Sequence, residues 1–255
     1  MNILLTNDDG VGSEGLLKLR DALCAKGKHR ICVLAPDRDR SGVSHGLKAL
    51  TVPLKFTEIE RDTWSCSGQP ADCVLAAVLG GKPCKPDAVV SGINQGANLG
   101  SDIIYSGTDA AARQAALMGI PGIALSLAGR GAFYWDMAAA YAADHLEELF
   151  ALWKKDVFIN VNIPNNPKAP DGRASTWPAV KRYQDKVSFF KALDGKEWCF
   201  FFSGNSSSEY EAGSDMDAVS RNLVSVSAVA VYPVVRRDCC AGVPDYAAVG
   251  NRRGC

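Results

Sequence analysis

Short apolar runs alternate with segments of helical periodicity along most of the chain. Residues 2–6 form an apolar run that ends at a polar segment, and residues 31–35 form a second run that also ends at a polar loop. Between them, leucines recur at helical spacing: Leu16, Leu17, Leu19 and Leu23. The pattern predicts a strand, a helix and a second strand, and such a unit places both loops at one edge of a parallel sheet.

The alternation continues to about residue 160. Extended segments are expected over 50–59 and 63–67, strands over 88–90, 123–127 and 157–164, and helices over 70–78, 108–118 and 133–154. Strands that alternate with helices are typical of an α/β fold with a doubly wound, mostly parallel, Rossmann-like sheet. We expect this sheet to form the core of residues 1–165.

After residue 165 the chain becomes rich in Pro, Asn and Gly, and two aromatic runs follow. Residues 187–190 and 198–202 flank Asp194 and Gly195, a pair typical of hairpin turns. A two-stranded arm cannot bury so many aromatic rings by itself. We expect residues 166–255 to form a hairpin arm and a tail that pack on the core or are exchanged between subunits.

The composition argues against proteins that bind nucleic-acid duplexes or membranes. The chain has 28 basic and 28 acidic residues, so it offers no basic field for a nucleic-acid duplex. No apolar run approaches the roughly 20 residues of a membrane span, and no signal peptide is recognisable, so we expect no membrane partner. The nine cysteines include no C-x-x-C pair, which favours reduced thiols in the cytoplasm.

Three of the predicted strands end in oxygen-bearing side chains, which are Asp8 and Asp9, then Asp37, Asp39 and Ser41, then Asn94 and Asn98. Ligands of open parallel sheets bind at this edge, and adjacent carboxylates repel each other unless a cation neutralises them. Carboxylate, hydroxyl and amide oxygens favour one Mg²⁺ or Mn²⁺ over Zn²⁺. The alternatives are a helix cap for the aspartates and a simple loop role for Ser41.

A second polar segment has the ingredients of an anion site. Residues 105–108 supply hydroxyls, a glycine and free N–H groups just before an alanine-rich helix. By itself the segment could be an ordinary Ser/Thr cap. Beside a hard cation it indicates a site that handles phosphoryl groups. His45, which follows Ser41 by four residues, is a candidate general acid or substrate contact.

These motifs resemble those of the SurE-type survival proteins, a family of metal-dependent 5′/3′-nucleotidases. The resemblance covers roughly the first half of the chain, and its motifs lie at 6–10, 35–42, 68–74, 86–94, 96–100 and 105–108. Several uncommon loops agree in order and spacing, which is more specific than any single motif.

The resemblance implies an enzyme that hydrolyses nucleoside 5′- and 3′-monophosphates with one divalent cation per subunit. It places the metal ligands on Asp8, Asp9, Ser41 and Asn94, and the phosphate contacts on Asn98, Ser106, Gly107 and Thr108. Asp8, Asp9 and Asn94 would form the catalytic set, with Asp8 or Asp9 orienting the attacking water. It also implies a homodimer or homotetramer in which C-terminal elements are exchanged.

The chain departs from the family pattern at several positions. Asp109 stands where the family has a small apolar residue, and an inward-facing charge there would weaken anion binding. Gln69 stands where the family has threonine. Residues 213–219 and 224–227 resemble a family segment only loosely, and residues 236–255 match nothing in the family.

Two other phosphoryl-handling classes fit less well. An aspartyl-phosphate phosphatase needs an aspartate at position 7, where this chain has Asn7. A response-regulator receiver needs a lysine where this chain has residues 126–130, and it is about half as long. A module of the same fold that binds nucleotide or phosphate without catalysis is the remaining alternative, and Asp109 is its only support.

Overall fold

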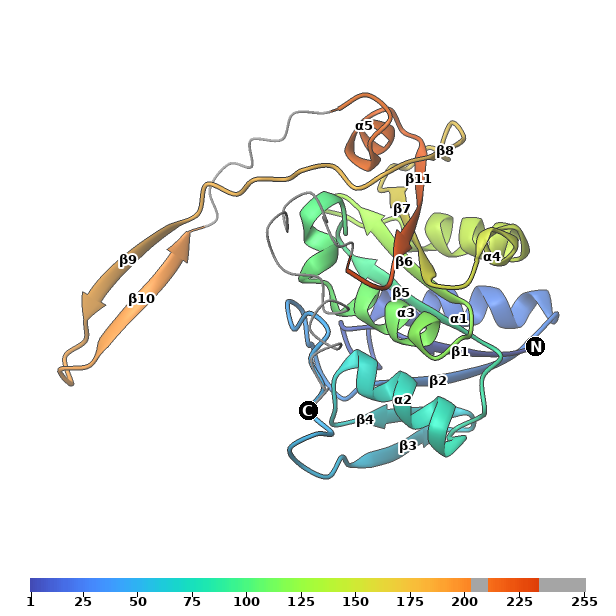
Figure 1. Cartoon of the computed structure of the whole chain (residues 1–255), viewed down its shortest axis with the longest axis horizontal. Coiled ribbons are helices and arrows are strands. Elements are labelled where there is room, and N and C mark those ends of the chain that lie inside the picture. Colours follow the sequence, from blue (N-terminus) through green and yellow to red (C-terminus); the bar gives the residue numbers. More distant parts are fainter. Residues whose placement is uncertain (203–210, 234–255) are drawn as a thin grey trace, which may run out of the picture.

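A computed structural model describes residues 1–202 and 211–233, and it contains a large central sheet and a separate two-stranded hairpin (Figure 1). The nine strands of the sheet are β1 (Asn2–Thr6), β2 (Arg30–Pro36), β3 (Phe56–Glu60), β4 (Thr63–Cys66), β5 (Ala88–Gln95), β6 (Gly122–Ala128), β7 (Val157–Pro164), β8 (Arg173–Ser175) and β11 (Val224–Ala230). The helices are α1 (Glu14–Lys26), α2 (Pro70–Gly80), α3 (Gly107–Leu117), α4 (Trp135–Leu152), α5 (Asp215–Ser220) and the short 3₁₀ helix η1 (Gly100–Ile104).

The sheet has the strand order β3-β4-β2-β1-β5-β6-β7-β11-β8. Its central strands, from β4 to β7, pair in parallel, whereas β3 and β11 run antiparallel to their inner neighbours. This arrangement confirms the predicted mostly parallel α/β sheet. The chain moves from β1 to β2 on one side and later returns to β5 on the other, so the strand order reverses at β1. Ligands of open α/β sheets bind at such a switch point.

Helices cover both faces of the sheet because side chains alternate along each strand. In β1, Ile3 and Leu5 pack in the core beneath α1 and α4, whereas Leu4 packs in the core beneath α2 and α3. The predicted helical leucines of α1, among them Leu16 and Leu19, are fully buried in the first of these cores. Each such side chain contributes about 1.5–3 kcal/mol.

The structure differs from the predicted elements in several places. Strand β5 continues to Gln95 instead of ending at Val90, with a shift of register against β6 between Ser91 and Asn94. Gly92 permits this irregularity, because it has a φ of +140° and a Cβ there would lie 2.3 Å from the carbonyl oxygen of Leu125. Strand β3 begins only at Phe56, and η1, β8, α5 and β11 were not predicted.

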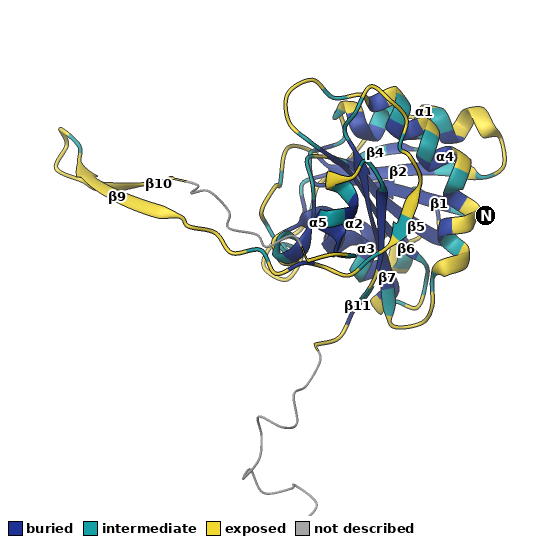
Figure 2. Cartoon of the chain, turned by 90° about the horizontal axis from the view of Figure 1, so that it is seen from above, coloured by how far each residue is buried: buried dark blue, intermediate teal, exposed yellow. Residues whose placement is uncertain are grey.

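The hairpin of β9 (Lys186–Lys191) and β10 (Glu197–Phe202) projects away from the body of the protein (Figures 1 and 2). Its antiparallel register places Val187, Phe189 and Phe201 on one face and Phe190, Trp198, Phe200 and Phe202 on the other. All of these side chains are exposed. The ribbon thus leaves apolar side chains exposed on both faces, and exposed apolar patches of this kind commonly mark an interaction surface.

The second part of the chain also contributes to the core sheet. Strand β11 pairs with β7, and β8 pairs with β11. The division at residue 165 therefore stays a prediction, and the tail 236–255 lies outside the described residues. Within those residues, no helix is long and apolar enough to cross a membrane.

Candidate functional site

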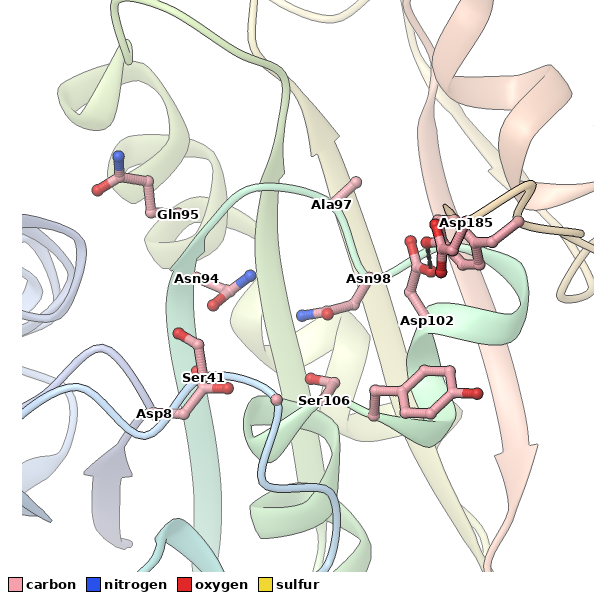
Figure 3. Close-up of a pocket in the computed structure, with 12 residues that line it drawn as sticks. Asp8, Ser41, Asn94, Gln95, Ala97, Asn98, Asp102, Ser106 and Asp185 are labelled. Atoms are coloured by element: carbon pink, nitrogen blue, oxygen red, sulfur yellow. Dashed lines mark hydrogen bonds between the residues drawn. The ribbon is translucent and has the colours of Figure 1, made fainter. Parts of the chain in front are cut away.

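A cavity of about 430 Å³ lies beyond the carboxyl ends of β1 and β5. The predicted site residues that line it are Asp8, Ser41, Asn94, Asn98 and Ser106. Figure 3 shows the amides of Asn94 and Asn98 turned toward the space between them. The switch point of the sheet thus brings together side chains from four separate loops or strand ends.

The turn after β1 is held by Asn7, the residue that excludes an aspartyl-phosphate mechanism. The Asn7 amide donates to the carbonyl oxygen of Gly10 (3.0 Å) and to the hydroxyl of Ser13 (2.6 Å), and it accepts from the Gly10 N–H (3.2 Å). Asn7 is buried and serves the backbone of the turn. The turn in consequence presents Asp8 and Asp9 at the mouth of the sheet.

Asp8 is held by the N-terminus of α3. The N–H of Gly107 donates to Asp8 Oδ2 at 3.0 Å, and the Thr108 hydroxyl donates to Asp8 Oδ1. These partners stabilise a carboxylate, as expected at the positive end of a helix. Even so, burial dominates and raises the pKa of Asp8 above its usual value.

Asp9 lies beside Asp8 and is less buried. Its Oδ2 accepts from the N–H of Gln95 at 3.1 Å. Burial and the neighbouring charge of Asp8 raise the pKa of Asp9 to about 6. The raised pKa values mean that the ionised forms of these two adjacent carboxyl groups are unfavourable without a nearby positive charge. A bound cation would supply that charge.

Ser41 is oriented by Asp39, which the sequence singled out only as a member of the same polar loop. Both the N–H and the hydroxyl of Ser41 donate to Asp39 Oδ1, at 2.7 and 2.6 Å. The hydroxyl proton is thereby occupied, so the lone pairs of the Ser41 oxygen are left for a cation. Asn94 donates from Nδ2 to the carbonyl oxygen of Gly96 (3.1 Å), which turns its Oδ1 toward Thr108 at 3.5 Å.

The donor set fits a hard divalent cation. Asp8, Asp9, Ser41 and Asn94 offer oxygen only, as Mg²⁺ and Mn²⁺ prefer. Within residues 1–202 and 211–233, no group of three or more His, Cys, Asp or Glu side chains could hold a metal ion. A cation bound at Asp8 and Asp9 would complete its ligand set with other oxygen donors, for which Ser41 and Asn94 are available.

Asn98 is fixed by a buried network of amides. Its N–H donates to Asn162 Oδ1 at 2.9 Å, and its carbonyl oxygen accepts from Asn160 Nδ2 and Asn162 Nδ2 at 2.9 and 3.0 Å. Its own Nδ2 donates to Ser126 Oγ at 2.9 Å, which leaves a second amide hydrogen for a ligand. Sequence reasoning did not single out Asn160 and Asn162, although two asparagines spaced by two in an apolar strand were a signal of a shared polar face.

Ser106, Gly107 and Thr108 occupy the start of α3, and their environments differ. Ser106 caps the helix, because its Oγ accepts from the Asp109 N–H at 3.0 Å, and it lines the cavity. Gly107 and Thr108 instead direct the donors described above to Asp8. The ordinary cap that the sequence allowed is thus present, and the phosphate contacts of these residues stay a prediction.

Asp109 is fully buried in the first turn of α3, and neither of its oxygens has a hydrogen-bond partner among the described residues. Burial raises its pKa to about 8. At pH 7 the carboxyl group is therefore largely protonated. Asp109 is also absent from the cavity lining, so the effect on anion binding expected of an inward-facing charge stays a prediction.

The far wall of the cavity comes from a segment that sequence reasoning left out. Asp102 of η1 pairs with Lys181 (Nζ to Oδ2, 2.6 Å) and accepts from the hydroxyl of Tyr183. Asp215 is fully buried and accepts from the N–H groups of Gly100 (2.7 Å) and Ala179 (3.0 Å). The second part of the chain thereby supports the loop that leads to Ser106.

His45 does not join the cavity lining. Its Nε2 lies 2.9 Å from Oε1 of Gln114, and burial lowers its pKa. The structure thus gives His45 a partner on α3, and its role as a general acid or substrate contact stays a prediction.

Comparison with known proteins identifies close relatives. The family described as Survival protein SurE matches residues 3–185. A 5′-nucleotidase SurE of Treponema pallidum (strain Nichols) is 50% identical over 171 residues, covering 64% of this chain and 89% of the relative. A 5′-nucleotidase SurE of Synechococcus elongatus is 40% identical over 241 residues, covering 89% and 92%. The crystal structure of SurE protein from Aquifex aeolicus aligns with a TM-score of 0.81 at 35% identity, covering 95% of this chain and 98% of that one.

Proposed function

Because the chain belongs to the Survival protein SurE family and is by that kinship a 5′-nucleotidase, we propose that it hydrolyses nucleoside 5′- and 3′-monophosphates with one divalent cation, Mg²⁺ or Mn²⁺. The observation that supports this most directly is the position of Asp8. This buried carboxylate lies beside Asp9 and faces a cavity that also contains Ser41, Asn94, Asn98 and Ser106. Oxygen ligands and anion donors thus meet within one space.

Asp8, Asp9, Ser41 and Asn94 would hold the cation. When bound, it supplies positive charge that polarises the phosphoryl oxygens and makes water easier to deprotonate. Asp8 is restrained by Gly107 and Thr108, so it serves as the rigid ligand of the set. Asp9 has one oxygen engaged by Gln95, and its Oδ1 can orient the attacking water and receive its proton.

The phosphate group would lie between Asn98 and Ser106. The second amide hydrogen of Asn98 and the hydroxyl of Ser106 can donate to its equatorial oxygens, where charge gathers during in-line transfer. The buried network around Asn98 keeps this donor in place without reorganisation. The N-terminus of α3 adds a favourable field for the anion.

We propose that the hairpin arm of β9 and β10 packs on another copy of the chain to form a dimer or tetramer. Its support is the exposed apolar surface on both faces of the ribbon. We also propose a cytoplasmic location, which the unpaired state of the described cysteines favours.

Phosphate release from a panel of 5′- and 3′-nucleoside monophosphates tests the activity. The assay is run with chelator, and then with Mg²⁺, Mn²⁺ or Zn²⁺ added back. Turnover that chelator abolishes and Mg²⁺ or Mn²⁺ restores is expected. Folded protein with no turnover of any monophosphate would instead favour the binding module without catalysis.

A further inference from the structure

A second cavity, of about 790 Å³, adjoins the site. Both cavities are lined by Gln95, Ala97 and Asp102, so the loop after β5 forms a wall that they share. In Figure 3 the Gln95 side chain points away from Asp8 and Ser41, and Ala97 lies next to Asn98. A ligand whose phosphate is held at Asn98 can therefore extend past the small side chain of Ala97 into the second cavity.

The two cavities differ in chemistry. The first is lined by three of the proposed cation ligands, Asp8, Ser41 and Asn94. The second is lined by Phe133, Arg130 and Lys181, and the charge of its carboxylate, Asp102, is matched by Lys181. Phe133 is half-buried, and one face of its ring stacks on Trp135 with centroids 5.2 Å apart. This stacking holds the Phe133 ring in a defined orientation at the cavity wall.

We propose that the second cavity binds the nucleobase of the substrate, which stacks on Phe133 while Arg130 donates to acceptor atoms at the edge of the base. The proposal rests on the proposed nucleotidase function and adds the residues that select a nucleotide over other phosphomonoesters. A volume of 790 Å³ lies within the usual range of ligand sites, about 300–1,000 Å³. Stacking on an aromatic ring adds affinity for any of the nucleobases, because each base presents a flat π-face.

Tyr105 and Tyr183 are the competing aromatic residues, because both line the first cavity. Both the hydroxyl and the ring of Tyr183 already have partners within the protein. Its hydroxyl donates to Asp102, and Lys181 Nζ lies 4.9 Å from its ring centroid. Tyr105 is 59% exposed and lies on the anionic side of the shared wall. Phe133 combines a ring supported by Trp135 with a guanidinium, that of Arg130, in the lining of the same cavity.

The test compares AMP with ribose 5-phosphate, which lacks the base. Phe133→Ala should lower the ratio of kcat/KM for AMP to that for ribose 5-phosphate by roughly 5- to 100-fold, mainly through KM. Phe133→Trp should restore the ratio. Arg130→Ala should lower the corresponding ratio most for GMP, because a guanidinium can donate to O6 and N7 of guanine together. Tyr134→Ala, an exposed aromatic neighbour outside the cavity lining, is the matched control and should leave the ratio unchanged.

Titration calorimetry of AMP and ribose 5-phosphate binding to the same proteins distinguishes a failure of the proposed nucleotidase function from a failure of the proposed base site. If AMP binds more tightly in a Phe133-dependent way but is not hydrolysed, the proposed function is wrong and the base site stands. If turnover is normal and Phe133→Ala changes both substrates equally or neither, the base site is wrong. A ratio that falls in Tyr105→Ala instead would place the base in the first cavity and would also overturn the proposal.

Discussion

A Cβ atom at residue 107 would lie 2.8 Å from the Cβ of Asp8 and 2.9 Å from its Oδ2. The glycine lets the first turn of α3 approach Asp8 closely enough for the hydrogen bond from the Gly107 N–H. Two residues that are 99 positions apart thus determine where the proposed metal ligand lies.

Gly107→Ala should displace Asp8 and lower kcat/KM about 100-fold, the effect of a misplacement near 1 Å. The measurement is phosphate release from AMP at several Mg²⁺ concentrations. Gly80→Ala is a suitable control, since no atom lies within 4 Å of the position of its Cβ. Near-normal turnover in Gly107→Ala would show that the close approach has no catalytic role.

Asp8→Asn should weaken cation binding and abolish turnover at limiting metal, because it removes one of two carboxylates from the donor set. Titration with Mn²⁺, followed by its electron paramagnetic resonance signal, measures the affinity directly. Asp37→Asn makes the same chemical change in a loop residue outside the cavity lining and serves as its control. Full activity of Asp8→Asn at limiting metal would refute the ligand assignment.

Acid should weaken cation binding through Asp9. Its pKa is raised from 3.8 to about 6, so in the metal-free protein its stabilising contribution is complete below pH 4 and is lost as the pH rises through 6. A bound cation reverses this loss of stability at higher pH, because it binds the ionised form of Asp9. The rise in Tm caused by Mg²⁺ should therefore be small at pH 5 and larger at pH 7.5.

The matching variant for this pH series is Asp9→Asn, which cannot titrate. Its Mg²⁺-induced rise in Tm should depend less on pH than that of the unaltered protein. Identical pH dependence in both proteins would remove Asp9 from the cation site.

Asp109→Asn should stabilise the protein at alkaline pH. The pKa of Asp109 is raised to about 8, so its contribution to stability is complete below pH 4 and is lost as the pH rises through 8. In a protein of this size, each kcal/mol recovered raises Tm by roughly 2–4 °C. Thermal unfolding should show little gain of the variant at pH 4 and a gain that grows up to pH 8.5, whereas a gain that is independent of pH would contradict the buried carboxyl.

Phe201→Glu should disrupt the proposed assembly, because this side chain is 75% exposed on one apolar face of the arm. Light scattering coupled to size exclusion measures the mass before and after the change. A lower mass with unchanged far-ultraviolet circular dichroism is expected. An unaltered mass, or a monomer in both proteins, would rule out the arm as the assembly surface. Lys196→Gln, near the turn of the hairpin, lowers the net charge by one as Phe201→Glu does and controls for the charge change.

The sequence by itself determined the parallel centre of the sheet, the helices α1 to α4 and the oxygen-bearing edge. Strands such as β1 and β2 are local apolar runs, α1 has its leucines at helical spacing, and parallel pairing places the residues after each strand at one edge. The membership of Asp8 and Asn94 in a single cavity follows from that local pattern. The strand–helix alternation ended near residue 160, and the short elements β8 and α5 had too few residues to show a period. Strand β11 (Val224–Ala230) does begin with a period-two alternation of valine and serine, so it was a missed signal.

Only the tertiary structure decided how the site residues are held. The partners of Asp8 lie on α3, Asn98 is held from β7, and Asp102 pairs with Lys181, a residue 79 positions away. Nothing in the local sequence specifies such pairs, because they form when distant segments pack together. Burial likewise decided the charge of Asp109, which the sequence presents as an ordinary carboxylate. Desolvation depends on the atoms that surround a group, and only the folded chain supplies those atoms.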